Sequence, residues 1–207
     1  MRKRAVHDVR GKSRAGFALC PLALAGALVL TGCAEPPGSA RAAVRAAERE
    51  LRSVGAVENA DSIADGTITT DAYYAAARRF RSCMRAAGLL LEGPHLSPVD
   101  NLTLEWAVDP EVPGGPEARA AIQECEERWW PMVSAYQASR PPEMNAELAA
   151  AVTRCLEDAG HAVPSRPTSI RDFLDVAEDE RAAPVERCVI DRAVELYPSL
   201  PGVTVIF

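Results

Sequence analysis

The chain has 207 residues, with 23 basic side chains against 29 acidic ones, and its formal net charge at pH 7 is −6. Six of the basic residues precede position 15, so the chain after residue 32 keeps 17 basic and 28 acidic residues, a net charge of −11. This balance argues against a nucleic-acid partner, because phosphates need a basic surface. It also argues against broad electrostatic binding to anionic lipid.

The first 32 residues predict a secretory signal peptide. A basic stretch from Arg2 to Arg14 is followed by an apolar run from Ala15 to Leu30 and then by small residues. This order is typical of an export signal. The apolar run is shorter than the roughly 20 residues that span a bilayer, so an uncut membrane anchor is the weaker alternative. Cys20 lies inside the signal and is expected to leave with it.

Leu30-Thr31-Gly32-Cys33 resembles the lipobox of bacterial lipoproteins. The resemblance implies cleavage before Cys33 and a diacylglycerol on its sulfur. It further implies a mature protein anchored by lipid to the outer face of the cytoplasmic membrane. Two acyl chains suffice for stable anchoring, since each buried CH₂ contributes about 0.8 kcal/mol.

The segment after Cys33 predicts a short tether and then an amphipathic helix over residues 39–54, with Ser39 as its cap and Gly55 as its stop. Four arginines share a face beside the apolar stripe: Arg41, Arg45, Arg49 and Arg52. The helix either lies on anionic headgroups or packs on the domain with solvated arginines, and we favour packing because no aromatic residue anchors the apolar side. Residues 56–68 are interpreted as a linker with an Asp65-Gly66 turn.

The middle of the chain predicts two helices and a strand. A helix capped by Asp71 ends at Gly88, and apolar residues alternate with polar ones over 102–107, as in a half-buried strand. A further helix opens with Pro116 and is expected to kink or end at Pro131.

The C-terminal part follows the Pro141-Pro142 boundary. Helices are expected over residues 145–159, 169–177 and 184–196, and the tail over 203–207 is a strand candidate that would pair with 102–107. We therefore divide the chain into a signal peptide (1–32), an anchor, tether and amphipathic helix (33–66), a first helical Cys unit (67–140) and a second (141–207).

Four cysteines remain after the signal and Cys33 are set aside: Cys83, Cys125, Cys155 and Cys188. An even set in an exported chain predicts two disulfides with three pairings. A Cys-x-x-x-Ala-Gly element occurs at both Cys83 and Cys155, and a second Cys follows each copy. The repeat favours Cys83–Cys125 and Cys155–Cys188, with pairing between the copies as the alternative. Because the cysteines are isolated rather than in close pairs, no metal site is expected.

The first copy resembles small exported lipoproteins of high-GC Gram-positive bacteria. The matching residues are Cys83-Met84-Arg85, Gly88, Asp109-Pro110, Pro116-Glu117, Ala120 and Cys125. The second copy departs at Leu156-Glu157. The family has no assigned activity, so the resemblance implies architecture. The expected fold is mainly α, with two disulfide-stapled, helical-hairpin-like repeats and a minor β hairpin or strand pair.

The sequence contains none of the hydrolase, metalloprotease or phosphate-loop motifs, so neither catalysis nor a cofactor is expected. His95 and His161 are interpreted as loop residues without a role, and the acidic residues around Cys125 and over 172–180 as solvated helix faces. Trp129 and Trp130 are the candidate binding residues; neighbouring helical side chains point about 100° apart, so one can be buried while the other stays exposed.

We interpret the chain as a non-catalytic protein-interaction or accessory module, with a binder of a small peptide or glycan as the alternative. A flat exposed apolar patch would favour the first function, and a concave pocket with a Trp and buried polar groups the second. The sequence predicts no oligomeric state.

Overall fold

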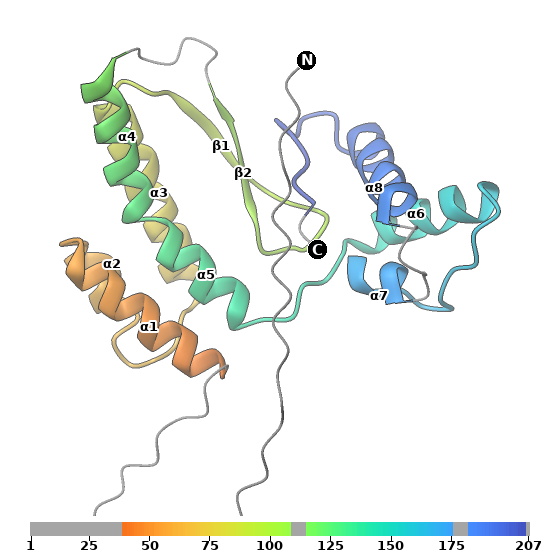
Figure 1. The fold of residues 1–207 in the computed structure, drawn as a ribbon, viewed down its shortest axis with the longest axis horizontal. Coiled ribbons are helices and arrows are strands. Elements are labelled where there is room, and N and C mark those ends of the chain that lie inside the picture. The colour runs from red at the N-terminus through yellow and green to blue at the C-terminus, as the bar shows by residue number, and fades with distance from the viewer. Residues whose placement is uncertain (1–38, 109–114, 176–181, 206–207) are drawn as a thin grey trace, which may run out of the picture. The chain divides into compact units, whose positions relative to one another are not determined.

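The computed structural model describes residues 39–108, 115–175 and 182–205 (Figure 1). These residues belong to the second of two compact units, Glu35–Phe207, whereas the predicted signal peptide and Cys33 lie outside the described residues. The described chain is mainly helical with one two-stranded antiparallel sheet, as the sequence predicted. Within these ranges no helix has the length and apolarity needed to cross a membrane.

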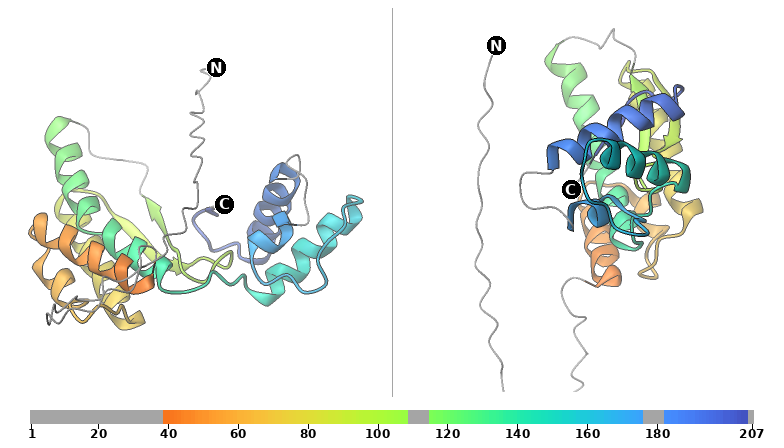
Figure 2. Two further views of the ribbon diagram at one scale, coloured as in Figure 1. Left: turned by 60° about the horizontal axis from the view of Figure 1, so that its bottom comes forward. Right: turned by 90° about the vertical axis from the view of Figure 1, so that its right-hand side faces the viewer.

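The first helix, α1 (Ala40–Ser53), begins where the sequence predicted. Ser39 Oγ accepts a hydrogen bond from Ala42 N at 3.1 Å, which satisfies one of the unpaired amides of the first turn. The apolar stripe of α1 is buried against α5 (Trp130–Ala138), and Figures 1 and 2 show the two helices side by side. The helix therefore packs on the domain, while Arg45 donates to the Ala64 carbonyl at 2.9 Å.

The predicted linker over 56–68 contains a short helix, α2 (Val57–Asp61), and the prediction was wrong there. Five residues are too few for a helical period to show in the sequence, and α2 has no side-chain cap. Burial of Asn59 and Ala60 holds the segment in place. The Asp65-Gly66 turn is confirmed, since Asp65 Oδ1 accepts from Thr67 N at 2.8 Å and Gly66 has a φ of 83°.

The helix α3 (Thr70–Ala86) is capped by Thr69 rather than by Asp71, because Thr69 Oγ1 accepts from Ala72 N at 3.1 Å. Asp71 is instead an acidic residue of the first turn. Gly88 follows the helix with a φ of 86°, the left-handed conformation expected after a helix end.

The sheet pairs β1 (Leu91–Leu96) with β2 (Leu104–Val108), so the strand predicted at 102–107 forms with a different partner. The Gly-Pro pair inside β1 hides that strand from sequence reading, since proline is depleted in strands. Residues 203–205 form no strand, and residues 206–207 lie outside the described residues. Thr204 instead donates from its N and Oγ1 to the two carboxylate oxygens of Glu105, both at 3.1 Å.

The two Pro residues act as predicted. Pro116 opens α4 (Pro116–Glu127), and the chain breaks before α5, where Pro131 lies in the first turn. In the C-terminal part, Asn145 caps α6 (Ala146–Asp158) by accepting from Glu147 N at 2.9 Å. The last two helices are α7 (Ile170–Asp175) and α8 (Ala182–Leu196), and the predicted continuation to 177 lies outside the described residues.

Two hydrophobic clusters form the core. The first gathers α1 to α5 and the sheet, and contains a stack of four aromatic rings in the order Tyr136, Tyr73, Trp129 and Phe80. Successive ring centroids are 4.0, 5.2 and 5.4 Å apart. The second cluster gathers α6, α7 and α8, together with Val99 from the loop between β1 and β2.

Both predicted disulfides are confirmed. Cys83–Cys125 joins α3 to α4, and Cys155–Cys188 joins α6 to α8, with Cα–Cα distances of 5.7 and 5.8 Å. Each bridge therefore ties together two helices of one cluster, which is the helical-hairpin-like repeat that the sequence predicted. The Asp109-Pro110 pair of the resemblance motif lies outside the described residues.

Candidate functional site

The two candidate tryptophans have different environments. Trp129 is 4% exposed and stacks between Tyr73 and Phe80, so it belongs to the core and cannot serve as a binding platform. Trp130 is 57% exposed at the first position of α5. The structure thus confirms that one ring is buried and the other exposed, and it leaves only Trp130 of this pair available to a partner.

The other titratable candidates do not converge on a site. His95 lies in β1 rather than in a loop, and His161 follows α6. Asp172 has a structural role, because its carboxylate accepts from Thr168 N and Ser169 N at 2.7 and 2.8 Å, and these hydrogen bonds hold its pKa below the ordinary value. No group of His, Cys, Asp and Glu among the described residues is arranged to hold a metal ion.

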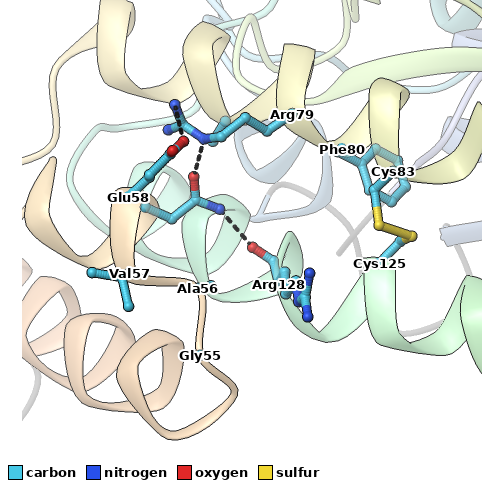
Figure 3. A pocket seen from close by; sticks show the side chains of 11 residues that line it. Gly55, Ala56, Val57, Glu58, Arg79, Phe80, Cys83, Cys125 and Arg128 are labelled. Atoms are coloured by element: carbon cyan, nitrogen blue, oxygen red, sulfur yellow. Dashed lines mark hydrogen bonds and ion pairs between the residues drawn. A yellow bond between two sulfur atoms is a disulfide. The ribbon is translucent and has the colours of Figure 1, made fainter. Parts of the chain in front are cut away.

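A pocket of ≈ 360 Å³ opens between α2, α3 and α4 (Figure 3). The α3 wall comes from residues spaced three, four and seven apart, which share one helix face. The C-terminal end of α4 supplies a second wall, and the turn into α2 supplies the third. The lining residues are Gly55, Ala56, Val57, Glu58, Asn59, Ala76, Arg79, Phe80, Cys83, Cys125 and Arg128.

Asn59 ties the three walls together. Its side chain is buried at 6% exposure; Oδ1 accepts from Arg79 Nε at 2.6 Å, and Nδ2 donates to the Arg128 carbonyl at 2.9 Å. A guanidinium only donates and a carbonyl only accepts, so the orientation of the Asn59 amide is fixed. This network connects α2 to α3 and to the end of α4.

The two arginines of the lining are only partly paired. Arg79 Nη1 is 3.8 Å from a carboxylate oxygen of Glu58, whose side chain is 80% exposed, and Arg128 Nη2 pairs with Glu124. Arg79 Nη2 and Arg128 Nε are buried and have no hydrogen-bond partner among the described residues. An exposed ion pair contributes little, whereas an unpaired buried donor costs about 1–3 kcal/mol or more when charged. Two donors on the lining side chains are therefore unsatisfied.

The chemistry of the lining suits binding. Its two cysteines are joined to each other, so neither offers a thiol nucleophile, and its one carboxylate belongs to the exposed Glu58. Two positive charges face one negative charge in a chain of net charge −6. Phe80, Ala76 and the Cys83–Cys125 bridge add an apolar wall, and Figure 3 shows Phe80 close to that bridge.

The sequence did not reveal this pocket. Asn59 lies 20 residues before Arg79 and 69 before Arg128, and its helix had been predicted as linker. One signal was available: Arg79 lies four residues before Cys83 on the cysteine-bearing face of its helix, where an apolar residue would be expected.

Comparison with protein-family models, with curated proteins and with solved structures finds no match to this chain. Its function is therefore inferred from its own residues, and the features that bear on it are the predicted lipobox at residues 30–33, the exposed Trp130 and the pocket.

Proposed function

We propose that the chain is a lipid-anchored extracytoplasmic lipoprotein, related to the small lipoproteins that its Cys-Met-Arg element resembles, and that its domain is a non-catalytic interaction module. One observation carries this proposal. The two disulfides use four of the five cysteines after the signal, and the remaining one is Cys33 of the lipobox. Disulfides form and persist in oxidising compartments outside the cytoplasm. The cysteine of a lipobox is the residue that accepts the lipid.

The position of the first helix fits an anchored domain. α1 begins at Ala40, seven residues after Cys33. Seven residues span at most about 25 Å when extended, so a lipid on Cys33 would keep the domain close to the membrane surface.

Metabolic labelling with alkyne-palmitate tests the anchor. We expect the wild-type chain and Cys20→Ala to incorporate label and to fractionate with membranes, because Cys20 lies within the signal. Cys33→Ala should lose both properties. Label on Cys33→Ala, or its unchanged retention on membranes, would contradict the proposal.

Trp130 is the residue at which we would test for a protein partner, since its ring is exposed at the start of α5. Large aromatic side chains are enriched at binding hot spots. A photo-crosslinker at position 130 should capture one recurrent membrane-fraction protein. The matched control is a crosslinker at Val194 on α8, which is also 57% exposed. Equal capture at both positions would argue against a specific surface at Trp130.

The pocket favours a second function, the binding of a small ligand. A concave site with a buried amide and two partly paired arginines meets part of the criterion for that alternative, which also required a tryptophan, and its lining contains none. The ligand would then be recognised by charge and by an apolar contact.

A further inference from the structure

We propose that the pocket between α2, α3 and α4 binds a small monocarboxylate that carries a short apolar group. This inference rests on the second function above and names the ligand class for it. It is drawn from three properties of the lining: its unpaired donors, its charge, and its apolar wall.

The first property of the lining is its unpaired hydrogen-bond donors. Arg79 Nη2 and Arg128 Nε belong to different helical segments, and both lack a hydrogen-bond partner among the described residues. These two nitrogens are closed off from solvent, but the side chains that carry them line the pocket and are 36% and 42% exposed, so a ligand in the pocket can contact the exposed part of each arginine. A carboxylate has two oxygens that accept hydrogen bonds and pairs strongly with guanidinium groups. A carboxylate is therefore the group that suits the arginines of this lining.

The charges of the lining favour an anion at Arg79. Arg128 is paired with Glu124, outside the lining, whereas the ion-pair partner of Arg79 is Glu58, which is 80% exposed and 3.8 Å away. A carboxylate in the pocket would give Arg79 a closer anionic partner, which a neutral amide of the same shape does not. Inorganic phosphate carries charge but has no apolar group.

The apolar wall adds the second part of the ligand. Phe80 and Ala76 lie one turn apart on α3, and the Cys83–Cys125 bridge continues that surface. A volume of ≈ 360 Å³ is at the lower end of the range for small-molecule pockets, about 300–1,000 Å³. It accommodates a carboxylate with a phenyl or short alkyl group.

The site is also held rigid before any ligand binds. Asn59 fixes Arg79 through its Oδ1 and the Arg128 backbone through its Nδ2, and the disulfide joins the α3 wall to the α4 wall. Groups that are already ordered lose little conformational entropy on binding, which favours affinity for a small ligand.

Isothermal titration calorimetry on the full chain, purified from the cells that export it, tests the proposal. The probes are 3-phenylpropionate, its neutral analogue 3-phenylpropionamide, and inorganic phosphate. We expect 3-phenylpropionate to bind with one-to-one stoichiometry and at least about tenfold more tightly than the other two, because the amide cannot form a charge-assisted hydrogen bond and phosphate has no apolar group.

Variants locate the binding. Arg128→Gln and Arg79→Gln should each weaken 3-phenylpropionate binding by about tenfold or more. Arg78→Gln is the matched control: it makes the same charge change on α3 at an exposed residue outside the lining, and should bind as the wild type does. The comparison of acid with amide needs no variant, so it stands even where Arg79→Gln, which also loses the Asn59 bond, does not fold.

Three results would overturn the proposal. These are no saturable binding of the carboxylate at millimolar concentration, equal binding of the amide or of phosphate, and equal loss of affinity in Arg78→Gln. The labelling and cross-linking experiments above are independent of this one. A negative calorimetry result therefore does not affect the proposals for the lipid anchor and the Trp130 surface. Negative labelling or cross-linking results likewise do not affect the proposal for the pocket.

Discussion

Removing the Cys155–Cys188 disulfide should destabilise the second cluster selectively. The double variant Cys155→Ala/Cys188→Ala opens a loop of 33 residues. The loop-entropy relation gives a loss of about 3.7 kcal/mol at 25 °C for this loop, and about 4 kcal/mol for the 42-residue loop closed by Cys83–Cys125.

The two clusters differ in how well they tolerate such a loss. The second cluster is built by a segment of roughly 65 residues, for which typical stabilities of 0.05–0.15 kcal/mol per residue give about 3–10 kcal/mol in all. Two of the five side chains that its helix α6 buries are Ala, which removes little apolar area from water, and none of the five is aromatic. A loss near 4 kcal/mol therefore takes a large part of its stability.

Two spectroscopic probes separate the clusters. All three tryptophans, at positions 106, 129 and 130, precede the second cluster's helices, so fluorescence follows the first part of the chain, while far-UV circular dichroism follows every helix. In a urea titration, we expect the variant to lose part of its far-UV circular dichroism signal at a low urea concentration. The midpoint of its tryptophan-fluorescence transition should stay nearly unchanged. Cys83→Ala/Cys125→Ala is the control and should move the fluorescence midpoint.

Equal shifts of the circular dichroism and fluorescence midpoints in Cys155→Ala/Cys188→Ala would refute the idea that each disulfide stabilises one cluster. A change below about 1 kcal/mol would refute the loop-entropy reasoning itself.

Further predictions concern single side chains. Tyr73→Phe should raise the free energy of unfolding by about 1 kcal/mol in urea titrations, because the fully buried Tyr73 hydroxyl has no hydrogen-bond partner among the described residues; a loss of stability would contradict this. Trp129→Ala should cost about 3–5 kcal/mol, since its ring lies inside the aromatic stack, whereas Trp130→Ala should change stability by less than about 0.5 kcal/mol; similar losses would show that Trp130 also packs. Asp172→Asn should lower stability by about 0.5–1 kcal/mol at neutral pH, because the carboxylate of Asp172 accepts two backbone hydrogen bonds in the folded state. These hydrogen bonds depress the folded-state pKa of Asp172. The carboxylate therefore stabilises the fold at pH values above the unfolded-state pKa, and this contribution is lost as the pH falls through the folded-state pKa. Wild-type and variant unfolding curves should thus converge in acid, and a constant difference would refute the assignment.

Local signals in the sequence predicted much of the fold. Ser39, Asn145 and Pro116 mark helix starts because a cap or an N1 proline acts within one turn. The repeated Cys-x-x-x-Ala-Gly element predicted both disulfide pairings, since each copy supplies a helix, its stop and a later cysteine.

Features that depend on distant contacts were missed. β1 contains Gly-Pro and is held by pairing with β2, and α2 is held by burial rather than by any period of its own. Thr204 donates hydrogen bonds to the side chain of Glu105, which lies 99 residues earlier, and does not pair with it in a sheet. The pocket depends on such long-range contacts, because Asn59 enters its lining only when α2 forms and packs on α3.

The Cys83–Cys125 bridge connects stability with the proposed site. It closes the largest covalent loop among the described residues and also forms part of the pocket wall, one turn from Arg79 on α3 and three residues from Arg128. Cys125 is the one residue of α4 that is fully buried, so without the covalent tie α4 would be held on α3 by little apolar area, and the position of Arg128 relative to Arg79 would be less well defined. The same bridge that stabilises the first cluster thus also holds in place the two arginines of the proposed carboxylate site.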